Sequence, residues 1–157
     1  MRSLAIFALV LATAVGAPVA GAECRPGAVE LRGDFGQARF RVEVADDGEE
    51  RMVGLMNRPE MAVGAGMLFV YPKPQRTISF WMRNTLIPLD ILFFDATGTM
   101  TARQLNAVPL DETMLDGGTD VQYVLEINGG LAERMGLDLG TQLRHPAIDP
   151  DLAAWGC

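Results

Sequence analysis

The sequence predicts a mainly β protein: a compact antiparallel β-sandwich or barrel-like domain with one or two short helices. Three observations support this fold class. Apolar or alternating segments recur at short spacing, 17 glycines and 9 prolines punctuate the chain, and no regular βαβ alternation is present. A chain of 157 residues, 49% of them hydrophobic and 21% charged, has the size and composition of one globular domain.

Seven segments have the pattern of strands, at 38–45, 66–71, 77–83, 89–94, 99–107, 122–128 and 141–143. The segments 38–45 and 77–83 alternate apolar and polar residues, as strands with one buried face do. The segments 66–71 and 89–94 are apolar almost throughout, which is typical of strands buried on both faces. Residues 111–120 are polar, acidic and contain glycine, so we expect an exposed loop there.

Two short helices are predicted between these strands. Residues 46–48 (Asp-Asp-Gly) break the first strand and can cap a helix over 49–58, which Pro59 ends. One or two helical turns at 130–135 end at Gly136, because glycine readily adopts the backbone conformation of a helix C-cap.

Residues 1–22 have the pattern of a cleaved secretory signal peptide. Arg2 supplies the positive charge, 4–19 is apolar, and Ala20–Ala22 offers small residues for cleavage. The apolar run is shorter than the ~20 residues that span a bilayer. We therefore expect a mature single domain, 23–157, that is exported to the periplasm or the cell exterior and is not inserted in the membrane.

The two cysteines lie at the ends of this mature domain. Cys24 would be its second residue and Cys157 its last. An even number of cysteines in an exported protein predicts a disulfide, and the ends of a domain often lie close together. The single histidine, His145, is expected at the surface.

Several classes of function lack their usual sequence features. The net charge of −7 argues against nucleic-acid binding, which relies on basic surfaces. The sequence contains no P-loop, no dinucleotide-binding glycine motif, no zinc-ligand cluster and no nucleophile–histidine–acid set. It therefore predicts no cofactor and no metal, and an enzymatic activity is not indicated, although the residues alone do not decide the question.

Polar residues beside aromatic ones supply the candidate binding site. Trp81 and Arg83 fall on one face of their strand, where a tryptophan next to an arginine can stack on a ring, a sugar or another planar ligand. An ordinary cross-strand pair that covers the sheet would give the same pattern. Asn84 and Thr85 follow directly in the chain.

Asp90 stands out because it shares a strand face with apolar residues and should be partly buried. A buried carboxylate needs a charged or hydrogen-bonding partner. Arg51 and Arg58, seven residues apart on the predicted helix, could reach Asp90 or Glu126. Such contacts would be either a structural ion pair or part of a polar pocket.

Four blocks of the sequence resemble the DUF192 family, a family of unknown function. They read RMVGLMNR at 51–58, GMLFVYP at 66–72, FWMRNTLIPLDI at 80–91 and YVLEINGG at 123–130. The resemblance covers about residues 41–143, and Arg83 stands where the family usually has lysine. It implies a compact, mainly β, sandwich-like fold and no established activity. It makes better candidates of Arg51, Trp81, Asn84, Thr85, Asp90 and Glu126.

The leading hypothesis is a non-enzymatic exported binding or accessory module. Its site would lie between the 51–58 helix and the 81–90 region, and its partner would be a small polar or anionic ligand or another protein. The candidate ligand-binding residues are Arg51, Arg58, Trp81, Arg83, Asn84, Thr85, Asp90 and Glu126.

Two other functions remain open. A hydrolase of saccharide or cell-wall material would use Asp90 and Glu126 as acid and base and Trp81 as a sugar platform. A copper-handling protein would use Met52, Met56 and Met61, since thioethers bind Cu(I). Packing of these methionines in the core is the default interpretation and is favoured over copper binding.

Overall fold

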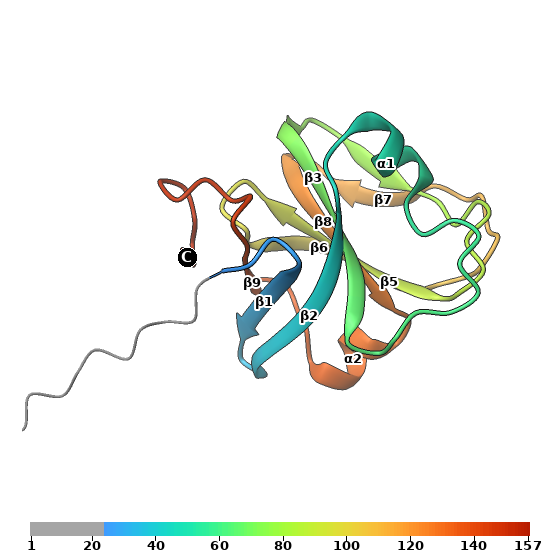
Figure 1. Ribbon diagram of the computed structural model, residues 1–157, viewed down its shortest axis with the longest axis horizontal. Coiled ribbons are helices and arrows are strands. Elements are labelled where there is room, and N and C mark those ends of the chain that lie inside the picture. Colours follow the sequence, from blue (N-terminus) through green and yellow to red (C-terminus); the bar gives the residue numbers. More distant parts are fainter. Residues whose placement is uncertain (1–23) are drawn as a thin grey trace, which may run out of the picture.

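The computed structural model describes residues 24–157, so the predicted signal peptide lies outside the described residues. Within them the chain folds into a curled seven-stranded sheet and a small two-stranded one (Figure 1). The strands are β1 (Ala28–Gly33), β2 (Gly36–Ala45), β3 (Ala65–Gln75), β4 (Ile78–Phe80), β5 (Leu89–Asp95), β6 (Met100–Ala107), β7 (Leu115–Gly118), β8 (Val121–Asn128) and β9 (Gln142–Arg144). The helices are α1 (Gly48–Val53) and α2 (Leu131–Met135).

The large sheet has the order β6-β5-β8-β3-β2-β1-β9, and the small one pairs β4 with β7. All strand pairs are antiparallel except β2 and β3 in the large sheet. These two strands run parallel, and α1 lies in the crossover between them. This single parallel pair departs from the predicted antiparallel arrangement, although the chain has no regular βαβ alternation. A parallel pair needs a long crossover, and residues 46–64 provide it.

The two ends of the large sheet meet, which gives the molecule its barrel-like shape. Thr99, just before β6, bridges Gln142 of β9. Around this bridge the main-chain N–H of Leu143 donates to Gly98 at 2.7 Å, and that of Met100 donates to Thr141 at 2.8 Å. The predicted mainly β, sandwich- or barrel-like class is thus confirmed.

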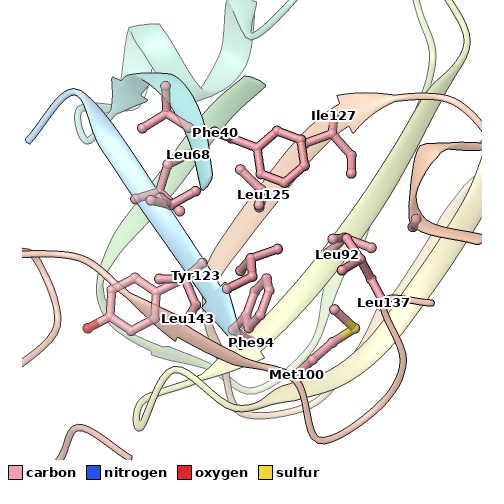
Figure 2. Close-up of a cluster of buried hydrophobic side chains, with 14 of the residues drawn as sticks. Phe40, Leu68, Leu92, Phe94, Met100, Tyr123, Leu125, Ile127, Leu137 and Leu143 are labelled. Carbon is pink, nitrogen blue, oxygen red and sulfur yellow. The ribbon is translucent and has the colours of Figure 1, made fainter. Parts of the chain in front are cut away.

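One hydrophobic core fills the space inside the curl. Figure 2 shows Phe40, Leu68, Leu92 and Leu125, from β2, β3, β5 and β8, with their side chains gathered in one cluster. Each of these side chains is at most 3% exposed. Burial of such side chains is the main stabilising contribution in a domain of this size.

A second core covers the opposite face of the same central strands. It contains Phe69, Ile91, Phe93 and Val124, and the small sheet packs over it. The ring of Phe80 from β4 contacts Phe93 edge-on, with centroids 5.7 Å apart. Strand β5 is therefore buried on both faces, as its apolar sequence predicts.

Some predicted elements differ from the structure. β1 was not predicted, and β7 lies within the expected loop 111–120. The strand expected over 77–83 is only Ile78–Phe80 long. Helix α1 ends at Val53 rather than at residue 58, because Gly54 adopts a positive φ of 49° that a continuing helix cannot contain.

The two ends of the described chain are joined. Cys24 and Cys157 form the predicted disulfide, with Cα atoms 5.6 Å apart. The C-terminal segment lies along the β1 and β9 side of the sheet (Figure 1), where Trp155 lies within cation–π range of both Arg32 and Arg144. His145 is 3% exposed, not a surface residue, and burial lowers its pKa although Pro26 accepts from its ring. Neither helix in residues 24–157 has the length and apolar character of a membrane span.

Candidate functional site

A pocket of about 300 Å³ opens on the second face of the sheet, between α1, the residues that follow it, and the small sheet. Its walls are apolar and aromatic, formed by Met52, Leu55, Met56, Phe69, Phe80 and Met114. Its polar or amphipathic lining residues are Arg51, Tyr71, Ser79, Trp81, Thr85 and Glu126. A mostly apolar cavity with a few polar groups is the usual form of a small-molecule site.

Glu126 lies at the centre of this face on β8. Its register neighbours are Met67 on β3 and Ile91 on β5, so apolar side chains flank it on both sides. It is 5% exposed and makes no hydrogen bond or ion pair with any residue that the structure describes. Burial raises the pKa of Glu126 to about 8. Its carboxyl group is therefore mainly protonated at pH 7.

Arg51 lines the pocket from α1, where the side chain of Asp47 caps the helix by accepting from the N–H of Glu50. Its Nη1 donates to the main-chain oxygens of Asp46 and of Val70, the latter at 2.9 Å. The guanidinium carbon lies 5.0 Å from the ring centroid of Tyr71, within range of a cation–π interaction. Arg51 is therefore held at the pocket by β3.

Tyr71 lies on β3, close enough to the two other ionisable groups of the pocket, Arg51 and Glu126, for both to influence its pKa. Burial raises the pKa of Tyr71, with a smaller opposing effect of Arg51 and an additional one from Glu126. Its hydroxyl group has no hydrogen-bond partner among residues 24–157. Tyr71 thus adds a second protonated O–H group to the pocket.

The segment after β4 brings Trp81 and Thr85 to the pocket. Met82 in the same segment is 1% exposed and Trp81 is 40% exposed, but Thr85, expected on the same side as Trp81, is only 5% exposed, because the strand ends at Phe80 and its alternation does not continue. Arg83 stacks on Trp81 with its guanidinium carbon 5.4 Å from the ring centroid. Thr85 is buried and donates to the main-chain oxygen of Arg83 at 3.3 Å.

Asn84 does not line the pocket but supports its wall. It adopts a positive φ of 54°, and its main-chain oxygen accepts from the N–H of Asn57 at 2.8 Å. This contact ties the segment after α1 to the segment after β4. The same two segments supply Met56 and Trp81 to the pocket.

Asp90 is fully buried and lies away from the pocket. It is the register neighbour of Ile127, one residue along β8 from Glu126, so the two carboxyl groups point to opposite faces of the sheet. Its oxygens accept from the main-chain N–H groups of Asn106, Gly130 and Ala132 at 2.7 to 2.9 Å. The expectation that an arginine pairs with Asp90 is wrong, because backbone donors occupy this position.

Arg58 also lies outside the pocket. It pairs with Glu43 on β2, and this contact lowers the pKa of Glu43. Neither Arg58 nor Arg51 forms an ion pair with Glu126 or Asp90. The structure thus gathers four of the eight candidates, Arg51, Trp81, Thr85 and Glu126, at one pocket.

Sequence reasoning missed Tyr71, Ser79 and Phe69 as lining residues. Phe69 and Tyr71 lie in the apolar run 66–71, which predicts a strand buried on both faces and gives no sign that one face opens to solvent. Ser79 lies in the alternating segment 77–83. The methionines also differ from the expectation. Met52 is 75% exposed rather than packed in the core, and Met61 packs against the second core without lining the pocket.

Residues 24–157 contain no group of three or more His, Cys, Asp or Glu side chains placed to hold a metal ion. Methionine sulfur atoms are a separate kind of ligand, which binds Cu(I). Met52, Met56 and Met114 all line the pocket.

Comparisons with known proteins agree with this fold. A crystal structure of a protein of unknown function from Novosphingobium aromaticivorans shares 41% identity with a TM-score of 0.72, over 81% of this chain and 89% of that one. A second, from Sinorhizobium meliloti 1021 and described as a "putative transcription regulator", shares 38% identity with a TM-score of 0.74, over 77% and 94%. No curated protein matches. The DUF192 family model, described as uncharacterized ACR, matches residues 29–145, and the chain belongs to this family.

Proposed function

We propose that this domain is a binding module whose site is the pocket beside Trp81 and Glu126. The observation that carries the proposal is Glu126, a carboxyl group that is 95% buried, faces a cavity and has no partner among the described residues. Its carboxyl oxygens are not fully enclosed by the protein, so they reach the pocket. A ligand in the pocket can form the hydrogen bond that no described residue supplies.

The other lining residues support a small organic ligand. Trp81 is partly exposed at the pocket and offers a flat surface for stacking. Phe69 and Phe80 pack edge to face with centroids 5.1 Å apart, which fixes the shape of the apolar wall. A rigid wall lowers the entropy lost on binding and favours a specific ligand.

The pocket supports binding better than it supports hydrolysis by paired carboxylates. Such hydrolases need two carboxyl groups about 5–10 Å apart across one groove. Glu126 and Asp90 belong to opposite faces of the sheet, and Asp90 is occupied by three backbone donors. The net charge of −7 also favours a small molecule or a protein over a nucleic acid as the partner.

We also propose that the protein lies outside the cytoplasm. The disulfide between Cys24 and Cys157 supports this location, since disulfides persist in oxidising compartments. The pattern of residues 1–22 points the same way. Detection of the protein in the periplasmic or extracellular fraction, with its N-terminus at residue 23, is the expected result.

A ligand screen tests the binding function. The oxidised protein is screened by thermal shift against carboxylates, amines, sugars and peptidoglycan fragments, since a ligand raises the melting temperature in proportion to its binding free energy. Trp81→Ala should lower the affinity for a ligand found in the screen at least tenfold, and Ser79→Phe should block the pocket. Arg58→Ala, outside the pocket, is the matched control. Absence of any hit, or hits that bind both pocket variants as well as wild type, would refute the proposal.

A further inference from the structure

The polar groups of the pocket also indicate the charge of its ligand, an inference that rests on the function proposed above. We infer that the pocket takes a small organic anion, a carboxylate on an apolar or aromatic body, whose head group accepts hydrogen bonds from Arg51, Tyr71 and Glu126. Each of these residues offers a donor, and the walls around them are apolar.

Arg51 has N–H donors that no described residue uses. Its Nη1 is used by the main-chain oxygens of Asp46 and Val70. A guanidinium group carries five N–H donors, so those on Nε and Nη2 have no acceptor among the described residues. A planar carboxylate is the acceptor that fits such a fork best.

Glu126 and Tyr71 are donors in the same pocket. Burial raises the pKa of both groups, so at neutral pH each keeps its proton and can donate an O–H. The remaining ionisable side chain that lines the pocket is Arg51, so the lining carries a net positive charge at pH 7. An organic cation would meet Arg51 and would require Glu126 to ionise among apolar neighbours.

The apolar walls determine the rest of the ligand. Phe69, Phe80, Met56 and Trp81 surround the donors. A volume of about 300 Å³ lies at the lower end of the range for small-molecule sites. The ligand is therefore a small amphipathic acid, with its carboxylate at Glu126 and its apolar body against the aromatic side chains.

This arrangement links binding to a proton. When Glu126 ionises, its negative charge faces the carboxylate of the ligand, and binding weakens. If only the protonated pocket binds, the apparent Kd rises about tenfold between pH 7 and pH 9, because the competent fraction falls as pH passes the pKa of about 8. For an organic cation the dependence has the opposite sign.

Three probes with the same phenylpropyl body and different head groups test the inference: 3-phenylpropanoate, 3-phenylpropylamine and 3-phenylpropan-1-ol. Their dissociation constants are measured by calorimetry between pH 6.5 and pH 9. We expect the acid to bind at least tenfold more tightly than the amine at pH 7 and to weaken about tenfold by pH 9.

Two variants distinguish the contributions of Glu126 and Arg51 to ligand binding. Glu126→Gln keeps a donor of the same shape without an ionisable proton, so it should bind the acid at every pH and lose the pH dependence. Arg51→Gln should weaken binding of the acid more than binding of the alcohol. Binding of the alcohol shows whether the pocket is intact. Tighter binding of the amine, or acid binding unaffected by pH in the wild type, overturns the ligand class while the binding function stands. If none of the three probes binds and the ligand screen finds no ligand, both the ligand class and the binding function are overturned.

Discussion

Replacement of Glu126 with glutamine is expected to stabilise the protein at neutral pH. The carboxyl group has an ordinary pKa of 4.5 when the chain is unfolded, and burial raises its pKa to about 8 in the folded state. Between these two values the folded state holds more protons than the unfolded state. The free energy of unfolding therefore falls as pH rises from 4.5 to 8.

The size of this effect follows from the two pKa values. Each pH unit between them lowers the free energy of unfolding by about 1.4 kcal/mol, which gives ~3 kcal/mol by pH 7 and ~5 kcal/mol above pH 8. Glutamine resembles the protonated acid in shape and does not ionise. Glu126→Gln should thus match the wild type near pH 4 and exceed its stability by ~3 kcal/mol at pH 7.

Urea unfolding of both proteins at pH 4, 5, 6, 7 and 8 measures this difference. Glu112→Gln, a change at an exposed carboxylate, is the matched control and should leave the stability within about 0.5 kcal/mol at each pH. A difference that stays constant with pH, or a Glu126→Gln protein that is less stable at pH 7, would show that Glu126 is charged and stabilising in the native state. Either result would refute the reasoning.

Three further predictions concern the fold, each measured by chemical or thermal unfolding. Asp90→Ala leaves three main-chain N–H groups, one buried and two partly buried, without their acceptor and should cost about 4 kcal/mol; a loss below 1 kcal/mol would contradict the geometry. Replacing Cys24 and Cys157 by serine should cost up to ~5 kcal/mol, and reductant should lower the melting temperature of the wild type alone. Gly66→Ala places a Cβ 2.5 Å from a main-chain oxygen of β8 and should cost about 1–3 kcal/mol, whereas Gly64→Ala meets nothing within 4 Å.

The fold class could be predicted because strand patterns depend on local burial. The apolar run of β5 indicated a strand buried on both faces, and two hydrophobic cores bury it. β7 escaped prediction because every residue in it except Leu115 is aspartate or glycine, and Gly117 is needed where a Cβ would meet the ring of Phe93 at 2.3 Å. The parallel pairing of β2 with β3 depends on the path of the chain, which residue patterns do not specify.

The candidate site could be predicted only in part, since periodicity assigns a side chain to a face and not to a depth. Trp81 and Glu126 were identified as candidates, and both line the pocket. The partners of Asp90 could not be foreseen, because they are backbone groups 16, 40 and 42 residues away. Tyr71 has no local signal that separates it from its buried neighbours, and only the packing of α1 and the small sheet makes it part of a pocket.

The bond between Cys24 and Cys157 converts the described chain into a covalent ring. A protease that cuts the exposed segment 111–114 once would therefore leave a single molecule, whose two pieces remain joined through the termini. The pieces can pair again at the high local concentration that the link imposes, rather than separating by dilution. A force applied between residues 24 and 157 would likewise stretch this bond before it reached the hydrogen bonds of the sheet.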